Sequence, residues 1–214
     1  SQERDGDSFE GAVVALGGLG VVTSLTLRVI PSFDVRQYVF VDVDLADIFG
    51  HFDEVMACAC SVSPFTDWRS GKASVWVKER VAPDDEVEPN AGTESRYQLF
   101  GMSPSTSPRH PSDDERSASC TEQQGVTGAW HERLPHFRLD HTPSVGAELQ
   151  SEYFVPRAHA VEALLAVHGL REEIAPLLHI SEIRSIAADN LWMSPCYQQD
   201  CIAIHFTWKL DWLR

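Results

Sequence analysis

The run Leu178-His-Ile-Ser-Glu-Ile-Arg-Ser-Ile-Ala187 predicts a β-strand, because β-branched isoleucines recur along it and neither glycine nor proline interrupts it. Side chains alternate between the two faces of a strand, so Glu182 and Arg184 share one face. A carboxylate beside a guanidinium on a rigid element could hold a polar substrate. The alternative is a solvent-facing ion pair, which contributes little to stability.

A second polar face is expected on the last strand, Cys201 to Leu210. Its apolar residues Ile202, Ile204, Phe206 and Trp208 alternate with His205, Thr207 and Lys209. A connection of about fifteen residues allows the two strands to be sheet neighbours. If their polar faces meet, they form a cluster that could hydrogen-bond several hydroxyl groups. Otherwise His205 and Thr207 face solvent.

The remaining pattern mixes strands and helices without strict alternation, which predicts an α+β fold, a mainly antiparallel sheet flanked by helices. The run Gly17-Gly-Leu-Gly20 is read as a turn between two strands, the second of which covers Val21 to Val29. Asp44 is expected to N-cap a helix, and Pro156 to occupy the first turn of another. Further strands are expected at 35–43, 61–67, 74–80 and 148–155, and irregular loops at 81–95 and 103–119.

The composition excludes several classes of function. The net charge of −15 at pH 7 disfavours binding to nucleic acid or to an anionic membrane. The five cysteines include only a C-x-C pair, Cys58 and Cys60, which predicts reduced thiols, a cytoplasmic location and no metal site. His131, His136 and His141 are spaced by five residues around Pro135, so they are read as loop residues and not as metal ligands.

Several long motifs resemble the bacterial alditol oxidases, which are vanillyl-alcohol-oxidase-type flavoenzymes related to the sugar-1,4-lactone oxidases. The first is Ser181-Glu-Ile-Arg-Ser-Ile-Ala-Ala-Asp-Asn-Leu-Trp-Met-Ser-Pro195, followed by Ile204-His-Phe-Thr-Trp-Lys209. Three other stretches resemble the same family, namely 9–23, 120–138 and 148–157. The resemblance covers nearly the whole chain and is weakest between residues 81 and 119.

The resemblance implies an FAD-dependent oxidation of the terminal hydroxymethyl group of a polyol, such as xylitol or sorbitol, to an aldehyde, with dioxygen reduced to hydrogen peroxide. In that family the Glu and Arg of the Glu-x-Arg strand bind the substrate hydroxyls and match Glu182 and Arg184. Both are the implied catalytic residues. The Thr of the His-x-Thr-Trp strand matches Thr207, which lines the site and the cofactor, and His205 is its neighbour.

The cofactor segment implied by the resemblance is Gly20, Val21 and Val22, at the end of the family's FAD-binding domain. We therefore expect residues 1–33 to be the remnant of that domain and residues 34–214 to be an incomplete substrate-binding (cap) domain. The family's pyrophosphate loop, the histidine that links covalently to FAD and a C-terminal lysine motif find no match here. We accordingly expect an internal fragment that is inactive alone and needs the missing FAD-binding domain of the same polypeptide.

Two other functions remain open on the sequence. A sugar-1,4-lactone oxidase shares the Glu-x-Arg device. A non-catalytic module that binds carbohydrate or a protein would explain the missing cofactor segment.

Overall fold

The computed structural model describes residues 2–82, 103–112, 117–141 and 148–210. Its strands are β1 (Asp34–Asp44), β2 (Ser61–Thr66), β3 (Lys72–Arg80), β4 (Ser103–Pro104), β5 (Gly128–Ala129), β6 (Glu148–Pro156), β7 (Leu178–Ile186) and β8 (Cys201–Lys209). The α-helices are α1 (Gln2–Val13), α2 (Leu45–Gly50), α3 (Phe52–Met56), α5 (Ala160–Gly169) and α6 (Arg171–Ile174). Short 3-10 turns cover Ser117–Ser119, Trp130–Glu132, Arg157–His159 and Ala175–Leu177.

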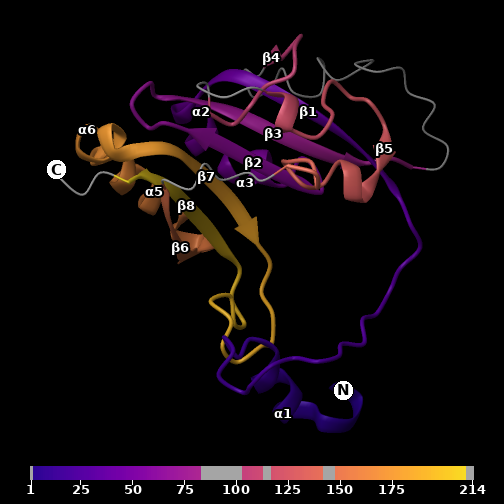
Figure 1. Cartoon of the computed structure of the whole chain (residues 1–214). Coiled ribbons are helices and arrows are strands. Elements are labelled where there is room, and N and C mark those ends of the chain that lie inside the picture. Colours follow the sequence, from indigo (N-terminus) through magenta and orange to yellow (C-terminus); the bar gives the residue numbers. More distant parts are fainter. Residues whose placement is uncertain (1, 83–102, 113–116, 142–147, 211–214) are drawn as a thin grey trace.

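All of the pairings in this sheet are antiparallel, in the order β4-β1-β3-β2-β7-β8-β6, and β5 also pairs with β1 (Figure 1). The predicted α+β class with a mainly antiparallel sheet is confirmed. Two halves of the sheet meet at β2 and β7, which share only the pairs Phe65–Glu182 and Thr66–Ser181. Glu182 therefore lies at the junction between the two halves.

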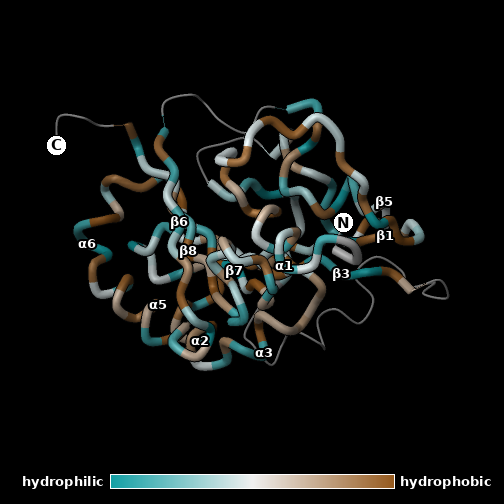
Figure 2. Tube along the Cα trace, turned by 90° about the horizontal axis from the view of Figure 1, so that it is seen from below, coloured by the Kyte–Doolittle hydropathy of each residue, from teal (hydrophilic) through white to brown (hydrophobic). Residues whose placement is uncertain are grey.

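One face of the sheet carries the main core, and α2, α3 and α5 lie on that side of the strands (Figure 2). Strand alternation delivers Ile183, Ile202 and Ile204 to this face, where each is at most 2% exposed. Ile48 and Leu164 reach the same core from α2 and α5. The apolar face predicted for the last strand is thus confirmed.

The opposite face is covered over β1, β2 and β3 by a loop, residues 117–141. Cys120 and Phe137 of this loop pack on Phe65 and Trp76 of the strands. Over β6, β7 and β8 the same face is less covered, and we call it the open face. Its residues are Gln150, Glu152, Arg184, His205 and Thr207, all exposed or half-buried.

The strands expected near the N-terminus are absent from the described structure, and this prediction is wrong. Residues 2–13 form α1, kinked at Gly6, and residues 21–33 are extended without sheet pairing (Figure 1). The turn at 17–20 does form, with Gly20 at φ 115°. A strand needs a partner for its backbone groups, and none of the strands described in this chain pairs with the segment. Its apolar side chains remain exposed, Val21 by 92%.

Two helix-start predictions also need correction. Asp44 occupies the N-cap position of α2, but its carboxylate makes no cap hydrogen bond and instead pairs with Lys72 at 2.7 Å. Pro156 ends β6, and a 3-10 turn separates it from α5. The expected loop at 81–95 lies almost entirely outside the described residues, whereas the segment 103–119 is irregular where it is described, apart from β4 and one 3-10 turn.

Candidate functional site

A row of polar side chains crosses three strands on the open face. In the sheet register Glu182 of β7 lies opposite His205 of β8, and His205 lies opposite Glu152 of β6. Residues opposite each other in a sheet point to the same face. Arg184 forms an ion pair with Glu152 through Nη2, and its Nε is 3.9 Å from Glu182 Oε2. Thr207 Oγ1 lies 3.4 Å from His205 Nε2.

The sequence-predicted polar cluster is therefore present: the four residues of β7 and β8 share one face. In the register Glu182 lies opposite His205, and Ile180 lies opposite Thr207. The pair Glu182 and Arg184 on β7 is therefore offset by two residues from the pair His205 and Thr207 on β8. The Glu182 side chain is 11% exposed and that of Arg184 41% exposed, so the pair is not a freely solvated surface ion pair. Arg184 Nε is buried and makes no hydrogen bond, and Glu182 Oε2 lies 3.9 Å from it.

Glu182 is also held from the other half of the sheet. His136, in the covering loop, has its Nε2 3.2 Å from Glu182 Oε1 and its Nδ1 3.2 Å from Lys78 Nζ. Lys78 is 1% exposed and also donates a hydrogen bond to the Leu134 carbonyl. A continuous chain of polar contacts thus runs from Lys78 to Glu182, and the weaker 3.9 Å contact extends it to Arg184.

The environment changes the ionisation of these groups. Burial lowers the pKa of Lys78 to about 8, although the charge of Glu182 acts in the opposite direction. Burial also lowers the pKa of His136, and its hydrogen bond to Glu182 only partly compensates. Burial by itself would raise the pKa of Glu182. The hydrogen bond from His136 and its charge, the charge of Arg184 and a hydrogen bond from Ser63 together outweigh burial and hold this pKa below its usual value. At neutral pH Glu182 is therefore ionised and His136 is neutral.

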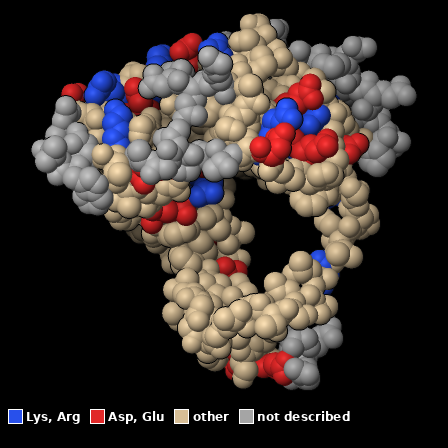
Figure 3. Space-filling view, viewed as in Figure 1, with Lys and Arg blue, Asp and Glu red and all other residues tan. Residues whose placement is uncertain are grey.

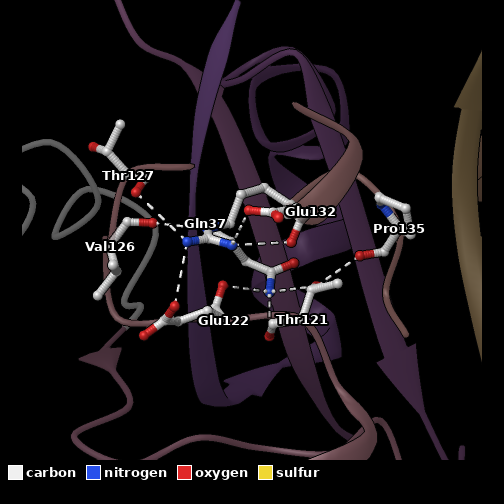
Figure 4. Close-up of polar contacts among 8 residues, drawn as sticks. Gln37, Thr121, Glu122, Val126, Thr127, Glu132 and Pro135 are labelled. Carbon is white, nitrogen blue, oxygen red and sulfur yellow. Dashed lines mark hydrogen bonds and ion pairs between the residues drawn. The ribbon is translucent and has the colours of Figure 1, made fainter. Parts of the chain in front are cut away.

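The covering loop is anchored to β1 by a buried amide (Figure 4). Gln37 Nε2 lies 3.3 Å from the Glu122 carbonyl and 3.4 Å from the Thr121 carbonyl. Thr121 in turn donates from its hydroxyl to the Pro135 carbonyl at 2.7 Å, and its backbone N–H donates to the His136 carbonyl at 3.0 Å. These bonds fix the backbone on which the His136 ring is carried.

Arg133 closes the other side of the loop. Its guanidinium donates to the Val126 carbonyl at 3.0 Å and to the Glu122 carboxylate at 3.2 Å. The side chain is 9% exposed, so the loop is held by buried as well as surface contacts.

The structure does not unite the expected cofactor segment with the cluster. Gly20, Val21 and Val22 lie in the extended N-terminal segment, where Val22 is 69% exposed and the Gly20 N–H donates only to Gly17 at 3.3 Å. Among the described residues, no backbone hydrogen bond joins this segment to β7 or β8. Their role in cofactor binding stays a prediction.

Three site residues were missed by the sequence reasoning. Lys78, His136 and Glu152 were not distinguished from ordinary polar residues. The available signal was slight: Lys78 directly follows the apolar run Val75-Trp-Val77 and lies on the same face of the strand as Trp76. His136 could not be placed, because its position depends on how the loop folds back.

A hollow of about 570 Å³ opens beside the cluster but not at it. Phe65 and Ile180, the neighbours of Glu182 and Thr207 in the sheet, line one side, and Arg109 and Lys209 are among the polar residues around it. Glu182 and Arg184 do not line it. Among the described residues, no group of three or more His, Cys, Asp or Glu side chains is arranged to hold a metal ion. No helix in the described ranges is both long and apolar enough to cross a membrane.

Comparison with known proteins gives two informative likenesses. An alditol oxidase of a Streptomyces species is 46% identical over 204 residues, which are 95% of this chain and 46% of that protein. An L-gulono-1,4-lactone dehydrogenase of Mycobacterium tuberculosis is 26% identical over 94% of this chain and 48% of its own length. No protein-family model matches the chain. The chain thus spans about half the length of the curated relatives it matches, and its resemblance to the alditol oxidases is confirmed.

Proposed function

We propose that this chain is the substrate-binding part of an FAD-dependent alditol oxidase, which oxidises the terminal hydroxymethyl group of a polyol and passes the electrons to dioxygen. The observation that carries the proposal is the alignment of Glu182, Arg184, His205 and Thr207 on one sheet face, in a chain 46% identical to an alditol oxidase. Within this proposal residues 34–214 are the substrate domain, and residues 1–33 belong with the FAD-binding portion of the polypeptide.

The donor and acceptor set suits a substrate with several hydroxyl groups. Glu182 is ionised and accepts hydrogen bonds only, Arg184 donates only, and the Thr207 hydroxyl does either. Arg184 also provides positive charge where negative charge develops on the substrate oxygen as its proton leaves. The Arg184 side chain is 41% exposed, so the accessible part of its guanidinium could donate to that oxygen.

Thr207, half-buried on the open face, would contact the flavin. Gly20, Val21 and Val22 would contact it only if their segment came to this face, because in this structure the segment is exposed and pairs with no described strand. When bound, FAD supplies the redox chemistry by accepting a hydride from the carbinol carbon and returning electrons to dioxygen. The task of this chain is to hold the carbinol carbon in reach and to keep the surrounding hydroxyls fixed.

The test is peroxide production by the full-length protein with xylitol and sorbitol. Glu182→Gln and Arg184→Ala should each raise KM and lower kcat, with kcat/KM falling roughly 10- to 100-fold, because each removes a hydrogen bond made by a charged group. Glu162→Gln and Arg171→Ala are matched controls on helices, where the Glu162 side chain is 82% exposed and that of Arg171 is 39% exposed. Unchanged kinetics in both site variants would contradict the assignment.

A second candidate is oxidation of an aldonolactone, favoured by the 26% identity to a lactone dehydrogenase. A lactone presents a ring carbon and a carbonyl in place of a flexible chain of hydroxyls. Comparing kcat/KM for polyols and for aldonolactones in the same peroxide assay separates the two, and an artificial electron acceptor in place of dioxygen reports a dehydrogenase.

A further inference from the structure

We propose that Lys78 and His136 are positioning residues that hold the Glu182 carboxylate ionised and turned toward the open face, so that Glu182 serves as a fixed acceptor for a substrate hydroxyl. This inference rests on the proposed function of Glu182. Neither residue touches the open face: they act on it through Glu182.

Lys78 is a buried cation without a direct counter-ion. Its side chain is 1% exposed, and among the described residues no carboxylate lies within ion-pair distance of Nζ. Its contacts are the Leu134 carbonyl and His136 Nδ1. Burying a charge is costly unless it is compensated. The compensating charge here is Glu182, reached through the imidazole ring.

The ring has one tautomer that satisfies both neighbours. Lys78 is donor-only, so Nδ1 of a neutral His136 must accept, which places the proton on Nε2. That proton then points at Glu182 Oε1, 3.2 Å away. A neutral ring is expected, because burial lowers the pKa of His136. Tilting the ring is resisted by its edge-on contacts with Phe65 and Trp76, whose centroids lie 5.2 Å and 5.4 Å from its own.

The two carboxylate oxygens of Glu182 therefore have different contacts. His136 contacts Oε1, whereas Oε2 lies 3.9 Å from Arg184 Nε, and the buried Ser63 also hydrogen-bonds the carboxylate. The other charged or titratable groups around it are His205, opposite on β8, and Glu152, which neutralises part of the Arg184 charge. Burial favours the protonated acid, and the hydrogen bond from His136 is the strongest of the contacts that oppose it, ahead of Arg184 and Ser63.

A protonated Glu182 would be a different group. It would donate a hydrogen bond as well as accept, and it would no longer balance Arg184. The positioning role therefore predicts a change in the pH dependence of substrate binding, whereas a role limited to supporting the loop predicts a uniform loss of activity.

The experiment titrates Glu182 directly in the full-length FAD-loaded protein. Infrared difference spectra recorded against Glu182→Gln isolate its carboxyl band, and His136→Phe and Lys78→Met remove the two contacts with little loss of volume. In both variants we expect the pKa of Glu182 and the acid limb of the kcat/KM profile to move together to higher pH by about one unit. At a fixed pH below the limb, kcat/KM should then be about tenfold lower than in wild type. kcat/KM well above the limb should fall much less.

The controls change the same residue types elsewhere. His131→Phe alters an exposed histidine of the same loop, and Lys72→Met alters a half-exposed lysine at the other end of β3. Both should leave the titration in place. His136→Gln retains a donor that can reach Glu182 and should restore the limb partly toward the wild-type position. An unshifted carboxyl titration in folded His136→Phe, or equal shifts in the controls, overturns the proposal.

Two features keep the outcome decisive. If His136→Phe fails to fold, the ¹⁵N shifts of His136 in the wild-type protein give the tautomer without any variant: Nε2–H at neutral pH supports the proposal, and Nδ1–H or a charged ring overturns it. The infrared titration also requires no turnover. If the wild-type protein oxidises no polyol, but His136→Phe still shifts the Glu182 titration relative to wild type, the proposed function is refuted and the positioning role stands.

Discussion

At the scale of a single residue, the lowered pKa of Lys78 can be tested through the pH dependence of the free energy of unfolding. Its pKa is lowered by burial from 10.5 to about 8, so between about pH 8 and 10.5 the unfolded chain binds more protons at this site than the folded chain does. Stability therefore rises with pH across this window, by about 3 kcal/mol at most from this group. Denaturant unfolding at pH 8 and pH 10 should show the rise in wild type and in Lys72→Met, and its loss in Lys78→Met. The same rise in Lys78→Met would show that other groups cause it.

The site contacts that follow from the sequence pattern and those that do not differ in one physical respect. Glu182, Arg184, His205 and Thr207 lie on two strands, and the period of two fixes which side chains share a face. Their meeting then needed only that the strands be neighbours, as β7 and β8 are. His136 meets Glu182 across 46 residues through a loop without regular period, and no local rule sets such a contact.

At the scale of elements, the covering loop depends on a close approach of its backbone to β1. Gly125 has φ 74°, and a Cβ there would lie 2.6 Å from the ring of Tyr38, which is itself 3% exposed. Gly125→Ala should therefore destabilise the protein by roughly 1–3 kcal/mol, since both backbone strain and overpacking act against it. Gly169→Ala, where a Cβ meets nothing within 4 Å, is the control and should change stability by less than about 1 kcal/mol. Thermal melts of the two variants measure the difference.

The same loop carries His136, so Gly125→Ala should also raise KM for the polyol more than it lowers kcat. A variant that loses stability but keeps KM would show that the loop can shift without moving His136.

Elements predicted well from sequence are those whose partner lies in this chain. The segment 21–29 has the composition of a strand but finds no partner among the described strands, and its pattern alone could not reveal that.

The whole molecule consists of a packed sheet domain and an N-terminal segment that leaves it. Figure 3 shows this segment arching away from the body with an opening between them, and α1 returns to the turn after β7, where Gly11 faces the Trp192 ring. Eight of the described apolar residues within 1–33 are at least 65% exposed: Leu16, Leu19, Val21, Val22, Leu25, Leu27, Val29 and Ile30. An exposed apolar stretch of this kind marks an interaction surface. This exposure is in line with the proposal that residues 1–33 belong with an FAD-binding portion.

Removing the segment should separate the two parts experimentally. A chain of residues 34–214 keeps every described strand of the sheet and its main core, so its melting temperature should stay within a few degrees of that of the 214-residue chain. Loss of the exposed apolar residues should reduce both dye binding by hydrophobic probes and self-association on a sizing column. Replacing Val21 and Leu25 by Asp in the 214-residue chain should also reduce dye binding and self-association. Unfolding of the shortened chain would show instead that the segment stabilises the sheet.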